Sequence, residues 1–244
     1  MTTESVRPIS TAMRESTSRT LGPIQLEATR AAPATMKANV LVVGAFADGT
    51  LPAAAAEIDS ASKGKLSGLI KRGDLETKAG ATLLLHDVPG IAAERVLVVS
   101  LGPAEKLGDK AFRDALSGAA KALGSGKATD AAVTLAAIDL PGRSAAWRVR
   151  EAGRMLADGL YRFDTPKTNG QSEPDRGVRK IALVGGDDVT EEIETAVRRG
   201  AAIAEGMALA RDLGNLPANV CTPEYFAETA RRMAKELPIE VEVL

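Results

Sequence analysis

The side chains that most often carry catalysis are scarce in this sequence. It holds one histidine, His86, and one cysteine, Cys221, which are 135 positions apart. A zinc site of the Cys/His type needs several such ligands, and nucleophilic catalysis needs a histidine beside the nucleophile. His86 directly follows the apolar run 81–85, so we interpret it as the end of a strand. Cys221 precedes a predicted helix, where a thiol can be activated, but no base lies near it in the sequence. Neither residue therefore predicts a reactive site.

Carboxylates are numerous but scattered. The pairs Asp187-Asp188 and Glu191-Glu192 come before and at the start of a predicted helix, where acidic side chains interact favourably with the helix dipole. A two-metal hydrolase site needs several carboxylates, usually with a lysine or histidine, converging from strand ends. No such set can be assembled from this sequence. We therefore predict no catalytic residue and no metal ligand in this chain.

Glycines follow two of the predicted strands, at Gly44 and at Gly185-Gly186. A glycine in this place can open a phosphate-binding loop that leads into a helix. Neither place carries the G-x-G-x-x-G or Walker pattern. We interpret both as tight turns between a strand and a helix.

The most distinctive segment covers residues 211–223 and reads R-D-L-G-N-L-P-A-N-V-C-T-P. In it, Asn215 and Asn219 bracket Pro217. Asparagine side chains can satisfy backbone groups in a turn, and proline restricts the direction of the chain. By itself the segment predicts an ordered turn between two helices.

Upstream of this turn, strand and helix patterns alternate from about residue 24 to residue 186. Short β-branched or alternating runs predict strands, and alanine-rich runs with apolar residues at helical spacing predict helices. The predicted strands are 24–31, 40–43, 81–86, 95–101, 130–137 and 180–184. The predicted helices are 51–72, 109–123 and 144–161, and 165–176 is a predicted loop. This order favours an α/β domain with a mostly parallel or mixed sheet that helices cover on both faces.

The chain after residue 186 has a different organisation. A long helix is predicted over 191–211, and a second over 222–237, with Thr222 as its cap and Pro223 in its first turn. Residues 239–244 alternate like a strand. A strand is an unusual end for a domain, so we expect a second domain of which only the start is present. Its apolar side chains, Phe226, Met233 and Leu237, should then lack neighbours.

The composition is that of an ordinary soluble globular protein. The 244 residues include 31 basic and 32 acidic side chains, and 45% are hydrophobic. The balanced charge gives no signal for nucleic acid or for a membrane surface, and no apolar stretch approaches the ~20 residues of a membrane span. Residues 1–21 lack the apolar core of a secretory signal and predict a disordered tail. A single cysteine fits a reducing compartment, so we expect a cytoplasmic protein.

Segment 211–223 resembles the start of the catalytic domain in the leucyl aminopeptidase family. The segment Leu160-Tyr161-Arg162-Phe163-Asp164, followed by Lys167-Thr168-Asn169, is similar to the end of the N-terminal domain in that family. The resemblance covers residues 22 to 244. The positions that carry the turn motif are Arg211, Asp212, Asn215, Pro217, Asn219, Thr222 and Pro223.

The resemblance implies a fold and a division into domains. After the tail over 1–21, which the composition predicts, it implies a macro-domain-like N-terminal α/β domain with a mixed sheet over 22–186 and a linker helix over 187–211. Residues 212–244 would then be the start of an incomplete α/β metallopeptidase catalytic domain. In the family that domain holds two divalent metals, Mn or Zn, and releases N-terminal amino acids from peptides. Members of the family assemble as hexamers, so self-association of this chain is possible.

The family's catalytic motifs are missing from these 244 residues. Neither N-T-D-A-E-G-R nor G-K-G-x-x-F-D-S-G-G occurs in the sequence. We therefore expect the chain to bind no metal and to be inactive alone, with peptide a substrate only for a longer form. Two alternatives stay open: a macro-like module that binds nucleotides of the ADP-ribose type, and a scaffold that joins subunits in a mixed oligomer.

Overall fold

The computed structural model describes residues 24–30, 32–163, 177–185 and 189–243. The predicted tail over 1–21, the predicted loop over 165–176 and the pair Asp187-Asp188 lie outside the described residues. The chain divides into two compact units. In its described part, the larger unit comprises residues 24–160 and 177–204, and the smaller comprises residues 161–163 and 205–243.

The larger unit is built on a mixed sheet of six strands in the order β1-β6-β5-β2-β4-β3. All neighbouring strands are parallel except the pair β3 and β4, which is antiparallel. The α/β fold class predicted from the alternation is thus confirmed. The strands are β1 (Gln25–Thr29), β2 (Val40–Ala45), β3 (Thr82–His86), β4 (Arg95–Ser100), β5 (Asp130–Val133) and β6 (Lys180–Val184).

The burial of each strand follows from its place in the sheet. Every residue of β2 is buried, because this strand lies between β5 and β4 and is covered on both faces. The edge strand β3 exposes alternate residues, including Leu84 and His86. His86 is therefore an exposed residue at the end of a strand, as its position after an apolar run predicted.

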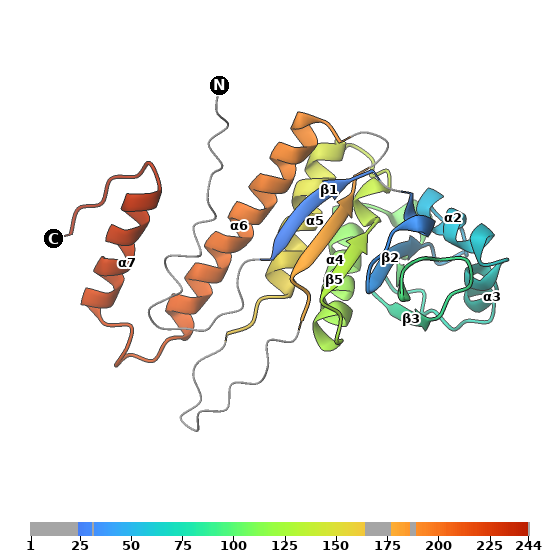
Figure 1. Ribbon diagram of the computed structural model, residues 1–244, viewed down its shortest axis with the longest axis horizontal. Coiled ribbons are helices and arrows are strands. Elements are labelled where there is room, and N and C mark those ends of the chain that lie inside the picture. Colours follow the sequence, from blue (N-terminus) through green and yellow to red (C-terminus); the bar gives the residue numbers. More distant parts are fainter. Residues whose placement is uncertain (1–23, 31, 164–176, 186–188, 244) are drawn as a thin grey trace. The chain divides into compact units, whose positions relative to one another are not determined.

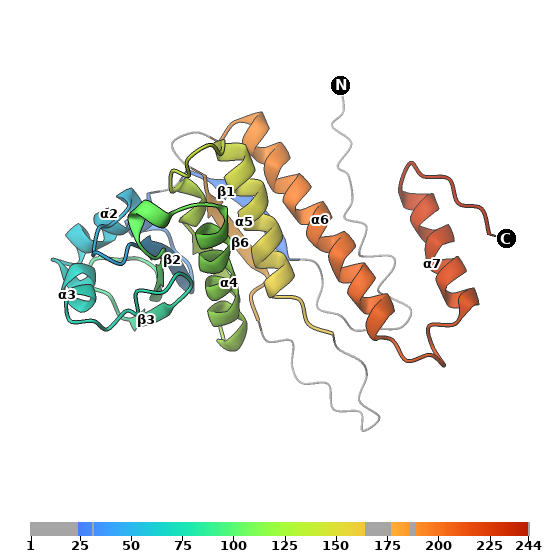
Figure 2. The same ribbon diagram turned by 180° about the vertical axis from the view of Figure 1, so that it is seen from behind.

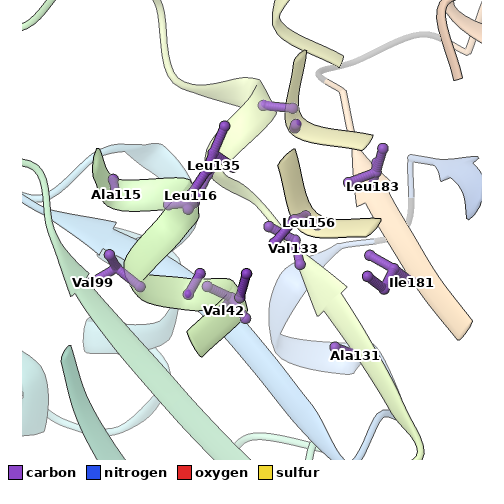
Figure 3. Close-up of a cluster of buried hydrophobic side chains, with 14 of the residues drawn as sticks. Val42, Val99, Ala115, Leu116, Ala131, Val133, Leu135, Leu156, Ile181 and Leu183 are labelled. Atoms are coloured by element: carbon purple, nitrogen blue, oxygen red, sulfur yellow. The ribbon is translucent and has the colours of Figure 1, made fainter. Parts of the chain in front are cut away.

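Helices cover both faces of the sheet and form two cores. On one face, α4 (Asp109–Ser125), α5 (Ala145–Gly159) and the first half of α6 (Glu191–Asn215) pack on alternate strand residues. Figure 2 shows α4 and α5 in front of the strands. On the other face lie α2 (Ala53–Ala61) and α3 (Lys65–Lys71), which Figure 1 shows beside β2 and β3. Figure 3 shows the first core, where Val42 and Val133 of the sheet meet Leu116 and Leu156 of the helices.

Two predictions in the larger unit are wrong in their detail. The single helix predicted over 51–72 is two helices, because Lys63 and Gly64 adopt left-handed backbone angles with φ of 56° and 80°. The strand predicted over 130–137 ends at Val133 and is followed by the 3-10 turn η3 (Leu135–Ala137). Two further 3-10 turns, η1 (Pro33–Thr35) and η2 (Ala104–Lys106), lie in the connections.

The smaller unit contains the second half of α6 and the helix α7 (Pro223–Glu236). Helix α6 continues to Asn215, four residues beyond its predicted end. Helix α7 begins as predicted, with the Thr222 hydroxyl accepting a hydrogen bond from the Tyr225 amide. The strand predicted at 239–244 is wrong for its described part, since residues 239–243 form no strand and pair with none of the described strands. A lone extended segment cannot form the ladder hydrogen bonds that define a strand.

Candidate functional site

Two segments that were singled out separately in the sequence meet in the smaller unit. The hydroxyl of Tyr161, just after α5, donates a hydrogen bond to Asp212 Oδ1 in the last turn of α6 over 2.6 Å. The guanidinium carbon of Arg211 lies 5.3 Å from the centre of the Tyr161 ring, within range of a cation–π interaction. Asn215, on the same helix end, acts to lower the pKa of the tyrosine. We call Tyr161, Arg211, Asp212 and Asn215 the tyrosine clasp.

The clasp changes the titration of its tyrosine. Burial and the hydrogen bond to Asp212 together raise the pKa of Tyr161 to about 12, although Asn215 acts in the opposite direction. Both dominant causes favour the neutral phenol, because ionisation would place an anion in a partly buried position beside a carboxylate. The tyrosine is thus held as a hydrogen-bond donor across the neutral pH range.

The other predicted motif residues form the turn and the cap that follow the clasp. The carbonyl of Pro217 accepts hydrogen bonds from the amides of Val220 and Cys221, over 2.8 and 3.0 Å. Thr222 caps α7 and Pro223 is its first residue. Asn219 is exposed in this turn. Asn215, the other asparagine expected to support the turn, is the last residue of α6, and the turn is closed by the backbone hydrogen bonds to Pro217.

Gly44 was predicted to form a tight turn after a strand, but it lies inside β2, whereas Gly185 directly follows β6 as predicted. Gly186 lies outside the described residues. A Cβ atom on Gly44 would lie 2.9 Å from Ile138 Cδ1 and 3.0 Å from a methyl of Leu101. A Cβ atom on Gly185 would lie 3.1 Å from Val149 Cγ2. Buried aliphatic side chains thus occupy the space beside Gly44 that a phosphate group would need. This geometry does not favour a nucleotide of the ADP-ribose type at the end of β2.

A buried ion-pair network joins α4 to α5 in the larger unit. Glu151 is 5% exposed, and its Oε1 accepts from Arg113 Nε over 2.6 Å and from Arg154 Nη2 over 2.8 Å. Burial alone would raise the pKa of Glu151, but the hydrogen bonds from Arg154 and Arg113 outweigh it and hold the pKa below its ordinary value. The carboxylate is fully paired by neighbouring guanidinium groups, which makes the network a structural one.

Metal-ligating side chains do not converge in the part of the chain that the structure describes. There, no three His, Cys, Asp or Glu residues are grouped closely enough to hold an ion. Among the same described residues, no helix is both long and apolar enough to cross a membrane.

Comparison with known proteins identifies the family. The family model for the N-terminal domain of the cytosol aminopeptidase family matches residues 42–170, more than half of the chain. The chain therefore belongs to the cytosol aminopeptidase family. It is 59% identical over 215 residues to a protein of Azoarcus sp. strain BH72 named "Probable cytosol aminopeptidase". That match covers 88% of this chain and 43% of the relative, so the chain spans less than half of the relative's length.

Solved structures of other proteins share the fold. The bottromycin maturation enzyme BotP superposes with a TM-score of 0.62 and 28% identity, over 83% of this chain and 38% of that one. A mutant of tomato leucine aminopeptidase shares the fold with a TM-score of 0.66 and 23% identity, over 87% of this chain and 42% of that one. The family resemblance inferred from the turn over 211–223 is confirmed.

Sequence reasoning missed the pairing of the two family segments. Tyr161 and Asp212 are 51 positions apart, and no sequence pattern around either residue indicates that the other is its partner. One signal was available: Asp212 stands near the predicted end of a helix, where a carboxylate faces the negative end of the helix dipole. A residue placed against that rule suggests a specific partner elsewhere in the chain.

Proposed function

We propose that this chain forms the N-terminal domain of an aminopeptidase that releases amino acids from the N-termini of peptides. The match of residues 42–170 to the N-terminal domain of the cytosol aminopeptidase family carries the proposal. We further propose that hydrolysis takes place in a part of the protein that these 244 residues do not contain, because the family's catalytic motifs are missing from them.

The proposed domain organisation follows the predicted one. Residues 22–186 would form the N-terminal domain, 187–211 a linker helix and 212–244 the start of the catalytic domain. The motif positions of the turn over 211–223 would then serve the structural start of that domain and not the binding of metal or substrate. The cap that Thr222 forms on the first turn of α7 supports an ordered start of the catalytic domain.

Metal would be bound by the catalytic part. The solved structure of BotP in complex with Mn supports manganese as the metal, with zinc the other candidate. We also propose a cytosolic location and self-association of the longer protein. The name of the Azoarcus relative supports the location.

Enzyme assays with two proteins test the proposal. The first is the 244-residue chain, and the second is a chimera in which this chain is continued by the remaining length of the Azoarcus relative. With Mn²⁺ and leucine-p-nitroanilide, we expect no turnover by the chain and metal-dependent turnover by the chimera. Turnover by the chain alone would show that it holds a catalytic centre, and a folded but inactive chimera would show that it cannot serve as this domain.

A further inference from the structure

The tyrosine clasp joins two segments that lie far apart in the sequence. Tyr161 follows the end of α5, whereas Arg211, Asp212 and Asn215 lie on the final turns of α6. One side chain thus contacts Asp212 through its hydroxyl and Arg211 through its ring. Phenylalanine would keep the contact with the ring but would lose the hydrogen bond, so tyrosine is the residue type that this arrangement requires.

Asp212 lies at a position where a carboxylate is locally unfavourable. The last turn of a helix presents unpaired carbonyl groups and the negative end of the dipole, and the last turn of α6 holds no basic residue. The phenol donates directly to this carboxylate over 2.6 Å, and the preceding Arg211 lies over the ring of the same tyrosine. A carboxylate that is unfavourable for its own helix, and is stabilised by a side chain from a distant segment, is typical of a residue with a specific contact to make.

The clasp immediately precedes the turn that starts the second helix of the smaller unit. The amide of Leu216 donates to the carbonyl of Asp212, so the residue that accepts from Tyr161 also closes the end of α6. The turn then passes through Pro217 to the cap at Thr222. The direction in which the chain leaves α6 therefore depends on how the final turn of that helix is held.

We propose that Tyr161 is a positioning residue for the aminopeptidase reaction, holding the end of α6 through Asp212 so that the catalytic part begins in a fixed direction. This inference rests on the proposed function. Tyr161 contacts no substrate in this scheme. Release of the clasp reduces the fraction of molecules whose catalytic part is correctly placed, and so lowers kcat while KM stays unchanged.

The test uses the chimera with Mn²⁺ and leucine-p-nitroanilide, at a temperature well below its unfolding transition. Loss of a hydrogen bond to a charged group predicts a decrease in kcat of about tenfold in Tyr161→Phe and in Asp212→Asn. The double variant should be no worse than either single one, because both remove the same contact. The matched control is Asp109→Asn, which removes a carboxylate of α4 in the larger unit and should keep full kcat.

The outcomes separate the two proposals. An unsubstituted chimera without activity contradicts the proposed function itself. An active chimera in which Tyr161→Phe and Asp212→Asn keep full kcat contradicts the positioning role. Variants that change only the unfolding temperature, with kcat intact, also contradict it, because the contact is then only structural. If Tyr161→Phe fails to fold, Asp212→Asn decides by the same measurement of kcat and KM.

Discussion

The two units of this chain differ in how their apolar side chains are used. In the larger unit, Phe112 of α4 is 0% exposed and lies in a continuous core between helices and sheet. In the smaller unit, Phe226 of α7 is 57% exposed, as was expected, whereas Met233 and Leu237 are half-buried. The larger unit therefore has the core of an independent domain, while the smaller unit relies on individual contacts such as the tyrosine clasp.

Matched substitutions of the two phenylalanines should give the largest difference between the units. We expect Phe112→Ala to lower the free energy of unfolding by ~3–5 kcal/mol, because it leaves a cavity in a packed core. Phe226→Ala should change it by less than ~0.5 kcal/mol, since most of that ring already faces solvent. Urea unfolding followed by far-ultraviolet circular dichroism measures both. Equal losses in the two variants would show that the smaller unit is packed as well as the larger.

The buried carboxylate of Glu151 should give the next largest effect. In Glu151→Gln the Arg113 and Arg154 guanidinium groups lose their anionic partner, and we expect a loss of about 2–3 kcal/mol in the free energy of unfolding. The control is Asp114→Asn, which breaks the exposed pair with Lys110 and should cost less than ~1 kcal/mol. Similar losses in both variants would refute a special role for burial.

The same carboxylate predicts sensitivity to acid. The pKa of Glu151 is held below its ordinary value of 4.5, so the folded state binds a proton less readily than the unfolded state. This contribution to stability is present above pH 4.5 and is lost as the pH falls through the lowered value. Unfolding midpoints measured from pH 6 downward should therefore fall less steeply in Glu151→Gln than in the unsubstituted chain. Parallel curves would contradict this.

Two glycines of α6, one in each unit, differ in how closely other atoms pack around them. A Cβ atom on Gly200, in the larger unit, would lie 2.6 Å from the carbonyl oxygen of Arg150, whereas Gly206, in the smaller unit, has nothing within 4 Å. We expect Gly200→Ala to cost ~1–3 kcal/mol through overpacking against α5. Gly206→Ala should stabilise α6 by up to ~1 kcal/mol through helix propensity. Thermal unfolding measures both, and a stabilised Gly200→Ala would show that the two helices can separate at no cost.

Local patterns in the sequence predicted most elements of the larger unit. The strands β2 and β4 were predictable because a strand buried on both faces must be apolar along its whole length. The break at Gly64 was not, because apolar spacing continues through α2 and α3 while a left-handed turn separates them. The end of β5 was missed for a similar reason: Leu135 and Ala136 are as buried in a 3-10 turn as they would be in a strand.

The candidate site was only partly predictable. Resemblance identified Asp212 and Asn215 as motif positions but gave no partner for either of them. The partner, Tyr161, is brought to them by the fold of the intervening chain, which no local pattern encodes. The strand expected at 239–244 is wrong for residues 239–243, because a strand forms only by pairing with a neighbour, and this segment pairs with none of the described strands.

The smallest expected effect tests the hydrogen bond of the tyrosine clasp, which joins distant segments of the smaller unit. The chain has two tyrosines, so Tyr225→Phe leaves Tyr161 as the only one that titrates. Its absorbance at alkaline pH should change with a midpoint near the value of about 12 set by burial and by Asp212. Because this pKa is raised above the ordinary value of 10, its contribution to stability is complete below pH 10 and is lost as the pH rises towards 12. Adding Asp212→Asn should move the midpoint back towards 10, since it removes the charge that opposes ionisation. A midpoint near 10 without that substitution would mean that the clasp is open in solution and that the smaller unit lacks even this contact.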